Sequence, residues 1–350
     1  MQNLTRAHDE LFTRHPDERF GSLAELWEHC DRTKRWSTVS WVPPDEFSVE
    51  PAVDGLFMAV RGTPMNLTDW SFTQLCSLAE VSKDTVNRLS GKTATDVFAE
   101  TWPRGAKPFQ ILTAQGTVQS IHRASYTRLF NVELLTTIRE FAVDFQPPQQ
   151  ALTESTADGD TPPATGLYCG EQDMFCFLID PTGWVEIDGE AFAPGFFVWN
   201  SEVGRRSVGI QTFWFQAICQ NHIVWDAVDV TEYTRKHTTN VHEALSNIQH
   251  MLARLVEMRD QRRDTFAKVI KKAMGTDLGT DAEDVMKVLR NHGIQKSVAQ
   301  EALKIAQQQG KFTIFSLVDA LTRLAREQKN AGDRTEADAK ASTLLALATV

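Results

Sequence analysis

The segment from Phe196 to His242 constrains the fold more than any other, because aromatic and β-branched residues are most concentrated there. If its residues between Ser207 and Cys219 form an extended strand, apolar side chains point to both faces. One face would present Val208, Ile210, Thr212, Trp214 and Ile218, and the other Phe213, Phe215, Ala217 and Cys219. Such a strand must be covered on both sides, so the segment predicts a central strand inside a layered core.

The residues before this strand predict a polar connection. Asn200-Ser201-Glu202-Val203-Gly204-Arg205-Arg206 leads into the strand, and Gly204 is free to adopt a positive φ angle. We therefore expect the connection to place Arg205 and Arg206 beside a rigid sheet.

The length of the chain predicts more than one structural unit. At 350 residues it exceeds a typical single domain, so we expect two or three packed units. No apolar run approaches the ~18 residues that cross a membrane. The N-terminal residues have no apolar stretch after a basic start, so we expect no secretory signal. These features predict a cytoplasmic protein without a membrane partner.

Charge is distributed unevenly along the chain. The whole sequence has a net charge of −10, which argues against a generally basic nucleic-acid binder. Residues 235–272 nevertheless contain nine Lys and Arg against four acidic residues. This asymmetry fits an anion-binding face on an acidic body, although a solvated helix face explains most charge runs.

Short-range patterns predict a mixed N-terminal region. Ser22-Leu23-Ala24-Glu25 matches a capping box that opens a short helix. The stretch from Glu46 to Arg61 predicts two strands joined by a turn at Val53-Asp54-Gly55, which is a hairpin.

Residues Gln74 to Arg88 resemble the helix-turn-helix of bacterial repressors. Val81, Ser82, Thr85, Val86 and Arg88 match that pattern, in which the second helix enters the major groove. The turn position that needs a positive φ angle is normally Gly but is Glu80 here, and this departs from the motif. The alternative is a pair of short helices with Ser82 as an N-cap.

The composition changes between Gln146 and Thr165, where proline and small polar residues leave almost nothing to bury. We expect a flexible linker there. After it, strands flanking the Asp180-Pro181-Thr182-Gly183 turn join the central strand in an antiparallel meander. From Thr239 to Met274 apolar residues recur at helical spacing, which predicts one helix of some 35 residues spanning roughly 50 Å.

These patterns predict an α+β protein, in which an antiparallel β-meander packs against a long helix. The expected units are a mixed α/β N-terminal region over 1–145, a linker over 146–166, a meander-plus-long-helix core over 167–275 and an all-helical C-terminal unit over 276–350. The apolar stripe of the long helix is longer than one small domain can cover, so we expect a subunit interface and a homo-oligomer.

Four pieces of the chain resemble an uncharacterised family of phage, prophage and plasmid proteins with a domain of unknown function. They are Gln74-Leu75-Cys76, Ser125-Tyr126 with Asn131, Asn200 to Gly204 with Cys219-x-Asn221 and Arg235 to Thr238, and Val318-x-Ala320-Leu321-Thr322. The resemblance implies carriage on a mobile genetic element and transfers no catalytic residue. A second similarity concerns layout alone: a meander, a basic rim and a long helix resemble single-strand-annealing recombinases.

Metal and catalytic motifs receive little support from the sequence. Five cysteines, odd in number and mostly in apolar company, favour reduced packing thiols: Cys30, Cys76, Cys169, Cys176 and Cys219. Cys219, His222, His237 and His242 have zinc-ligand chemistry, but their spacing departs from finger patterns. Phosphate-loop, dinucleotide, metalloprotease and nucleophile-elbow motifs are missing from the sequence. We therefore expect no cofactor and assign no catalytic residue.

A basic rim around the central strand predicts DNA binding. Arginine and lysine neutralise phosphates, and an exposed indole stacks on an unpaired base. The candidate contacts are Arg205, Arg206, Arg235, Lys236 and His237, with Arg88 for the helix-turn-helix alternative. The function expected from the sequence is non-catalytic binding or annealing of single-stranded DNA in replication or recombination of a mobile element. The alternatives are a sequence-specific transcriptional regulator using residues 74–89 and a structural or assembly protein.

Overall fold

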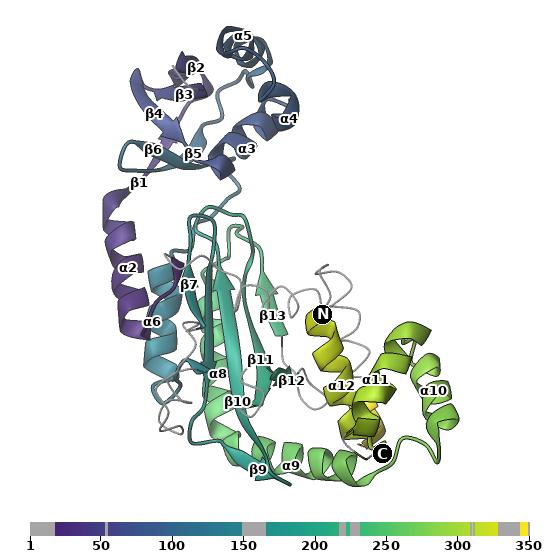
Figure 1. Cartoon of the computed structure of the whole chain (residues 1–350). Coiled ribbons are helices and arrows are strands. Elements are labelled where there is room, and N and C mark those ends of the chain that lie inside the picture. Colours follow the sequence, from purple (N-terminus) through teal and green to yellow (C-terminus); the bar gives the residue numbers. More distant parts are fainter. Residues whose placement is uncertain are drawn as a thin grey trace.

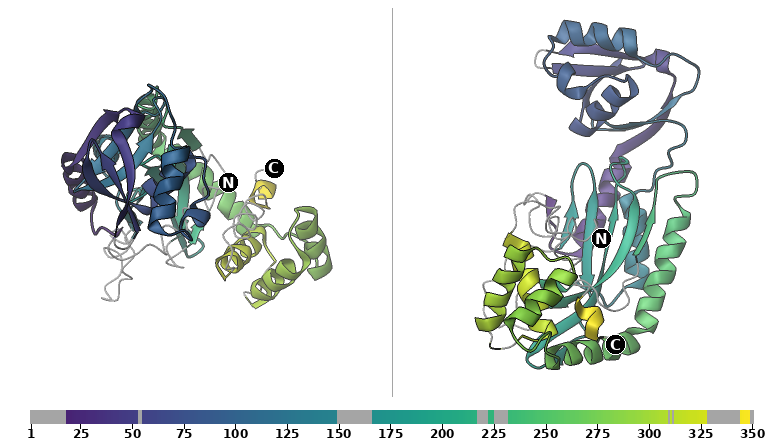
Figure 2. Two further views of the ribbon diagram at one scale, coloured as in Figure 1. Left: turned by 90° about the horizontal axis from the view of Figure 1, so that it is seen from above. Right: turned by 90° about the vertical axis from the view of Figure 1, so that its right-hand side faces the viewer.

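A computed structural model describes residues 18–52, 55–148, 166–216, 222–224, 232–308, 310, 312–327 and 344–348. The chain is an α+β protein with two β-sheets and a C-terminal group of helices (Figure 1), which confirms the predicted fold class. An upper lobe contains the first sheet, and narrow connections join it to the larger lower lobe (Figure 2).

The upper lobe is a six-stranded sheet covered by helices. Its strand order is β1-β5-β6-β4-β3-β2, antiparallel except for the β4–β6 pair. The strands are β1 (Ser37–Val42), β2 (Phe47–Ala52), β3 (Gly55–Val60), β4 (Thr63–Leu67), β5 (Phe109–Ala114) and β6 (Thr117–His122). The helices are η2 (Pro44–Glu46), α3 (Asp69–Leu78), α4 (Lys83–Val86) and α5 (Gly91–Thr101). Strands β2 and β3 confirm the predicted hairpin.

The helix-turn-helix resemblance holds at the turn and fails at the second helix. Glu80 adopts φ 57°, so this position has the left-handed conformation that the motif needs, although it is not glycine. Helix α4 has four residues and is followed by turn residues. A single turn does not provide the helix that normally lies in the major groove. Ser82 caps α4 by accepting a hydrogen bond from the Thr85 amide, as expected for a pair of short helices.

The lower lobe contains a seven-stranded antiparallel sheet whose main strand order is β12-β11-β10-β8-β7. The strands are β7 (Leu167–Cys169), β8 (Met174–Ile179), β9 (Val185–Ile187), β10 (Glu190–Asn200), β11 (Val208–Gln216), β12 (His222–Val224) and β13 (Glu232–Arg235). Strand β11 is central and buried on both faces, as its sequence predicts. Ile210 packs on the side of the helices, whereas Phe213 and Phe215 belong to a separate aromatic cluster on the opposite face.

Helices from both halves of the chain cover one face of this sheet. They are α2 (Leu23–Trp36), α6 (Asn131–Phe141) and α8 (Glu243–Glu257). Leu26, Leu135 and Ile248 from these helices share one hydrophobic core with Phe196 and Val198 of β10. The hydrophobic cores therefore do not follow the boundary expected at residue 145, since α2 and α6 pack on the second sheet. Most of the expected linker, residues 149–165, lies outside the described residues.

The predicted long helix is two helices, α8 and α9 (Arg259–Gly275), which meet at Met258. Arg259 pairs with the buried carboxylate of Asp180 in the β8–β9 turn, so the chain turns toward the end of the sheet there. The apolar stripe is covered within the chain: Leu252 packs in the helix-covered core, and Phe266 stacks on Trp214 at 3.8 Å. The stripe thus gives no reason to expect a subunit interface.

The C-terminal helices α10 (Ala282–Asn291), α11 (Lys296–Gln308), α12 (Ile314–Glu327) and η3 (Ala346–Ala348) pack with α9 in one core. Asp281 caps α10, and Gly293 and Gly310 have positive φ angles where helices end. Residues 328–343 of the expected all-helical C-terminal unit lie outside the described residues. Within the described part of the chain, each helix is too short or too polar to cross a membrane.

Candidate functional site

The predicted basic residues lie at one end of the second sheet, but most of them are engaged with other groups. Pairing of Val208 with Arg235 brings β13 beside the loop that contains Arg205 and Arg206. Arg206 pairs with Asp173, and its side chain is only 11% exposed. Arg235 lies 3.3 Å from Glu243. Arg206 is therefore not part of the free cationic rim that the sequence predicts, whereas the ion pair of Arg235 with Glu243 is exposed.

The remaining DNA-binding candidates differ in exposure. Arg205 is exposed, and its guanidinium lies 5.0 Å from the ring of Trp70. Lys236 is exposed, whereas His237 is buried. Arg88 is exposed but belongs to the upper lobe, where its Nε donates to the Asp84 carbonyl. The structure thus leaves Arg205 and Lys236 exposed, and Arg235 in an exposed ion pair, at this end of the sheet.

The zinc candidates do not form a site within the described residues. Cys219 lies outside them, and only the backbone of His222 is described. His237 is buried near Tyr126, and His242 is exposed before α8. The described part of the chain contains no group of three or more His, Cys, Asp and Glu that could hold a metal ion.

The loop over 200–204 is held between the two lobes by polar side chains. We call this loop, together with His122, Tyr126, Arg128 and Asn131, the interlobe joint. The indole of Trp70 donates to the Val203 carbonyl at 2.7 Å, and His122 Nε2 contacts the same oxygen at 3.0 Å. Tyr126 donates its hydroxyl to the Glu202 carbonyl at 2.9 Å, and Arg128 donates to that carbonyl as well.

Gly204 is required in this joint for two reasons. Its φ angle is +74°, a conformation that residues with a Cβ rarely adopt. A Cβ at this position would also lie 2.5 Å from His122 Cε1 and 2.8 Å from Tyr126 Cε2. The glycine predicted to allow the turn thus also allows two aromatic rings to approach the loop.

The carboxyl group of Glu202 is buried in the joint. It accepts a hydrogen bond of 2.7 Å from the Asn131 amide, and the side chain of Asn131 in turn accepts one from Asn200. Burial raises the pKa of Glu202 from its ordinary 4.5 to about 7, because the charged form loses solvation. The residues quoted for the phage and plasmid resemblance, including Tyr126, Asn131 and Asn200 to Gly204, therefore meet in space.

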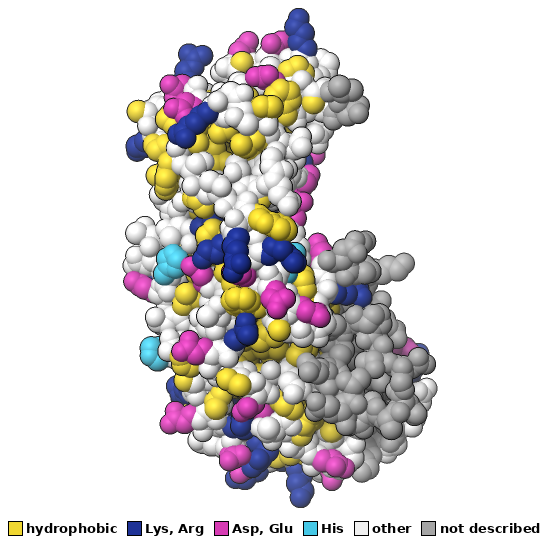
Figure 3. Space-filling view, turned by 90° about the vertical axis from the view of Figure 1, so that its left-hand side faces the viewer, with side chains coloured by type: hydrophobic (Ala, Val, Ile, Leu, Met, Phe, Trp, Pro, Cys, Tyr) yellow, Lys and Arg dark blue, Asp and Glu magenta, His cyan; other side chains and the backbone are white. Residues whose placement is uncertain are grey.

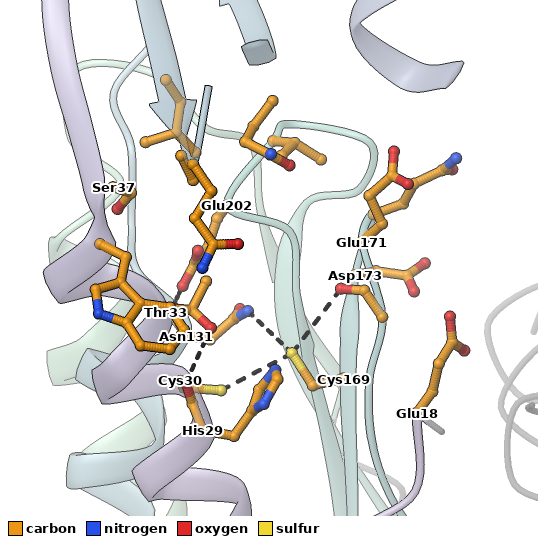
Figure 4. Close-up of a pocket in the computed structure, with 18 residues that line it drawn as sticks. Glu18, His29, Cys30, Thr33, Ser37, Asn131, Cys169, Glu171, Asp173 and Glu202 are labelled. Carbon is orange, nitrogen blue, oxygen red and sulfur yellow. Dashed lines mark hydrogen bonds between the residues drawn. The ribbon is translucent and has the colours of Figure 1, made fainter. Parts of the chain in front are cut away.

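A pocket of about 400 Å³ lies beside the joint (Figure 4). Its wall includes His29, Cys30 and Thr33 of α2, the turn from Cys169 to Asp173, and Glu202. The Cys30 thiol donates to Cys169 Sγ at 3.9 Å, and Asn131 Nδ2 donates to the same sulfur at 3.8 Å. The hydrogen bond from Cys30 and the neighbouring His29 lower the pKa of Cys169 below its ordinary value, although burial opposes the shift.

The sequence did not indicate this pocket. Cys30 and Cys169 are 139 residues apart and match no spaced motif. The packing role expected for all cysteines fits Cys76 and Cys176, both buried and both with a pKa that burial raises. A surrounding of hydrogen-bond donors distinguishes Cys169 from them, and tertiary structure supplies those donors.

A second surface combines exposed aromatic and basic side chains. Trp36, Val39 and Trp41 are 55%, 41% and 44% exposed. Arg32 lies 5.8 Å over the Trp36 ring, and Arg35 belongs to the last turn of the same helix. Figure 3 shows Lys and Arg side chains gathered on this side of the molecule, below the upper lobe. We call residues 32–41 the α2–β1 surface.

Comparison of the chain with protein-family models, with curated proteins and with solved structures found no match. The inferences below therefore start from features of the chain itself, among them the thiol pocket and the α2–β1 surface.

Proposed function

We propose that the protein binds single-stranded DNA without catalysis and that the α2–β1 surface makes the contact. The observation that supports this is the exposure of Trp36 and Trp41 beside arginines on one short stretch. An indole that is half exposed keeps much of its apolar area in water, which costs free energy unless a ligand covers it. Unpaired bases present flat apolar faces that stack on such rings.

The geometry of the surface suits an extended strand of nucleic acid. Within the described residues β1 lies at the edge of the first sheet, paired with β5. Residues 39 and 41 alternate with residue 40, so Val39 and Trp41 share one face of this edge. Trp36 ends the helix that leads into β1. The two indoles are therefore spaced along the direction in which a bound strand would extend.

Charge on this surface is positive but partly compensated. Arg35 pairs with Asp31 at 2.6 Å, yet its side chain stays 74% exposed. Lys34 lies 3.3 Å from Glu133. Exposed pairs of this kind contribute little and exchange readily with phosphate. We expect a shallow dependence of affinity on salt, because only a few phosphates are neutralised.

The proposed role in replication or recombination of a mobile element rests on the sequence resemblance, and the binding surface rests on the exposure of these side chains. The apolar stripe of the long helix is covered within the chain, so it does not support homo-oligomerisation. DNA binding does not require an oligomer.

The test is a fluorescence titration of the full chain with a labelled single-stranded oligonucleotide and with duplex DNA at two salt concentrations. Replacing both Trp36 and Trp41 with alanine should weaken single-strand binding by about 1–3 kcal/mol per lost stack. Replacing Arg32 and Arg35 with alanine should flatten the salt slope by about 1.4. The control pair is Lys271→Ala with Lys272→Ala, two exposed cations on α9 that should leave binding unchanged.

Other outcomes reject this surface in favour of a different one. Loss of binding in the Arg205→Ala, Lys236→Ala variant, with the tryptophan variant unaffected, would place DNA on the predicted rim. Selective loss of duplex binding on replacing Thr85 and Arg88 would support the regulator. Absence of binding at low salt to either form of DNA would favour the structural or assembly protein.

A further inference from the structure

Cys30 and Cys169 come from segments far apart in the sequence and meet in the thiol pocket. Cys30 lies on α2 and Cys169 at the end of β7, with 3.9 Å between their sulfur atoms. A disulfide needs a separation of about 2.0 Å, so the sulfurs must approach by roughly 2 Å. Cys30 is buried, but Cys169 is partly exposed, and both line a pocket of about 400 Å³. A small oxidant of water-like size fits easily in this volume.

The surroundings of Cys169 favour a reactive sulfur. The Cys30 thiol and Asn131 Nδ2 both donate to it, and His29 of the same helix as Cys30 also lowers its pKa. The acidic residues that line the pocket are Glu18, Glu171, Asp173 and Glu202; Asp173 raises the pKa of Cys169 and Glu202 that of Cys30. The hydrogen bond from Cys30 is the largest influence, and it lowers the pKa of Cys169 below that of an ordinary thiol. The Gly170 carbonyl, 3.9 Å away, accepts only from the neutral thiol.

We propose that Cys169 is a peroxide-reactive thiolate and that Cys30 is its resolving thiol. This inference is independent of DNA binding. The Cys169 sulfur attacks one oxygen of a hydroperoxide: the S–O bond forms, the O–O bond breaks, and the leaving alkoxide or hydroxide takes up a proton. Sulfur loses two electrons and becomes a sulfenic acid. The Cys30 sulfur then attacks Cys169, and a disulfide forms as water leaves with the Cys30 proton.

The disulfide would join α2 to β7 directly beneath the interlobe joint. Asn131, which donates to Cys169, also binds Glu202 through its backbone amide. Oxidation removes the thiolate that accepts a hydrogen bond from the Asn131 side chain, so oxidation of Cys169 affects the joint through Asn131. The pocket is thus a modification site for low-molecular-weight peroxides.

The experiment treats the full-length protein with stoichiometric hydrogen peroxide in the presence of a sulfenic-acid trapping reagent and maps all five cysteines by mass spectrometry. Wild-type protein should yield a Cys30–Cys169 disulfide that dithiothreitol reverses. Cys30→Ser should accumulate trapped sulfenic acid at Cys169, and Cys169→Ser should show neither product. At pH 7 Cys169 should react at least about a hundredfold faster than Cys76 or Cys176, because little thiolate exists at those buried sites. The rate should reach its plateau at a lower pH than the rate of an ordinary thiol does, because the pKa of Cys169 is lowered.

The control variants Cys76→Ser and Cys176→Ser should behave as wild type. Equal labelling of Cys169 and Cys76 would overturn the proposal, as would a disulfide from Cys219 or labelling of Cys30 in the Cys169→Ser variant. Mapping of the wild-type cysteines needs no substitution, so it tests the proposal even if a variant fails to fold.

Discussion

The imidazole of His122 and the phenol ring of Tyr126 lie face to face, with centroids 3.5 Å apart and planes 5° from parallel. The stack rests against Gly204 and links β6 of the upper lobe to the loop of the lower lobe. The two lobes have separate hydrophobic cores, so polar contacts at this joint fix much of their relative position. The joint should therefore be more sensitive to single polar substitutions and to pH than a shared apolar core would be.

Arg128 should be the most sensitive residue of the joint. Its buried guanidinium donates to the Glu202 carbonyl, to Gln110 Oε1 and to Ser120 Oγ. Arg128→Met would leave Gln110 Oε1 and Ser120 Oγ without this donor and the Glu202 carbonyl with the Tyr126 hydroxyl alone, so we expect the free energy of unfolding to fall by about 2–3 kcal/mol. Urea denaturation measures this. Arg123→Met, at an exposed arginine of the same segment, should change it by less than about 0.5 kcal/mol. Equal effects would contradict a special role for Arg128.

Glu202 should make stability fall as pH rises from about 4.5 to 7. Its folded pKa of about 7 exceeds the ordinary 4.5, so the folded protein binds more protons in this window. Glu202→Gln keeps an acceptor for the Asn131 amide but never ionises. The free energy of unfolding of the variant minus that of wild type should therefore increase by on the order of 1–3 kcal/mol from pH 4.5 to pH 8.

Two buried histidines also make stability depend on pH, so the effect of Glu202 must be measured as a difference from wild type. Burial lowers the pKa of His122 to about 3 and that of His237 to about 4, from an ordinary 6.5. Their unfolded forms bind more protons below pH 6.5, so they make stability rise with pH there. These residues are unchanged in the variant, and their effect cancels in the difference. A difference that is flat with pH would show that Glu202 ionises normally.

Gly209 should not tolerate a side chain. A Cβ there would lie 2.6 Å from Trp199 Cε2 and 2.7 Å from the Tyr233 carbonyl, both in the sheet. We expect Gly209→Ala to lower the thermal midpoint by several degrees, because strands β10 and β13 cannot both move away. Gly275→Ala is the matched control, since nothing lies within 4 Å of its Cβ position. A midpoint for Gly209→Ala equal to that of the control would contradict the packing described.

Replacing Glu80 with glycine should stabilise the protein. Its φ angle of 57° is unfavourable for a residue with a Cβ, and glycine adopts it without that cost. We expect Glu80→Gly to raise the free energy of unfolding by about 0.5–1 kcal/mol. Glu80→Ala retains the Cβ and should give no gain. If both variants changed stability alike, the effect would come from loss of the carboxylate.

Local patterns in the sequence predicted features that depend on neighbouring residues. Alternation along Val208 to Phe215 gave a strand buried on both faces, and Asp180 to Gly183 gave a turn. The positive φ angle at Gly204 was also predicted. Each of these depends on side-chain periodicity or on the conformational freedom of one residue, and both act over a few positions of the chain.

The candidate site was only partly predicted, because its contacts join residues that are far apart in the sequence. The connection over 200–206 was predicted as polar, and the structure buries its Glu202 against Asn131. Arg206 was expected to face a ligand and pairs with Asp173 instead. A charged residue in a sequence carries no information on which distant group it meets.

By itself the sequence determined the α+β class, the two-faced central strand, the hairpin and the glycine turns. Only the tertiary structure decided that α2 and α6 cover the second sheet, that the long helix breaks at Met258 and that Cys30 meets Cys169. It also decided that Trp36 and Trp41 remain exposed. The physical reason is range: backbone preference and periodicity are local, whereas burial, ion pairing and thiol reactivity depend on groups that the fold brings together from distant positions.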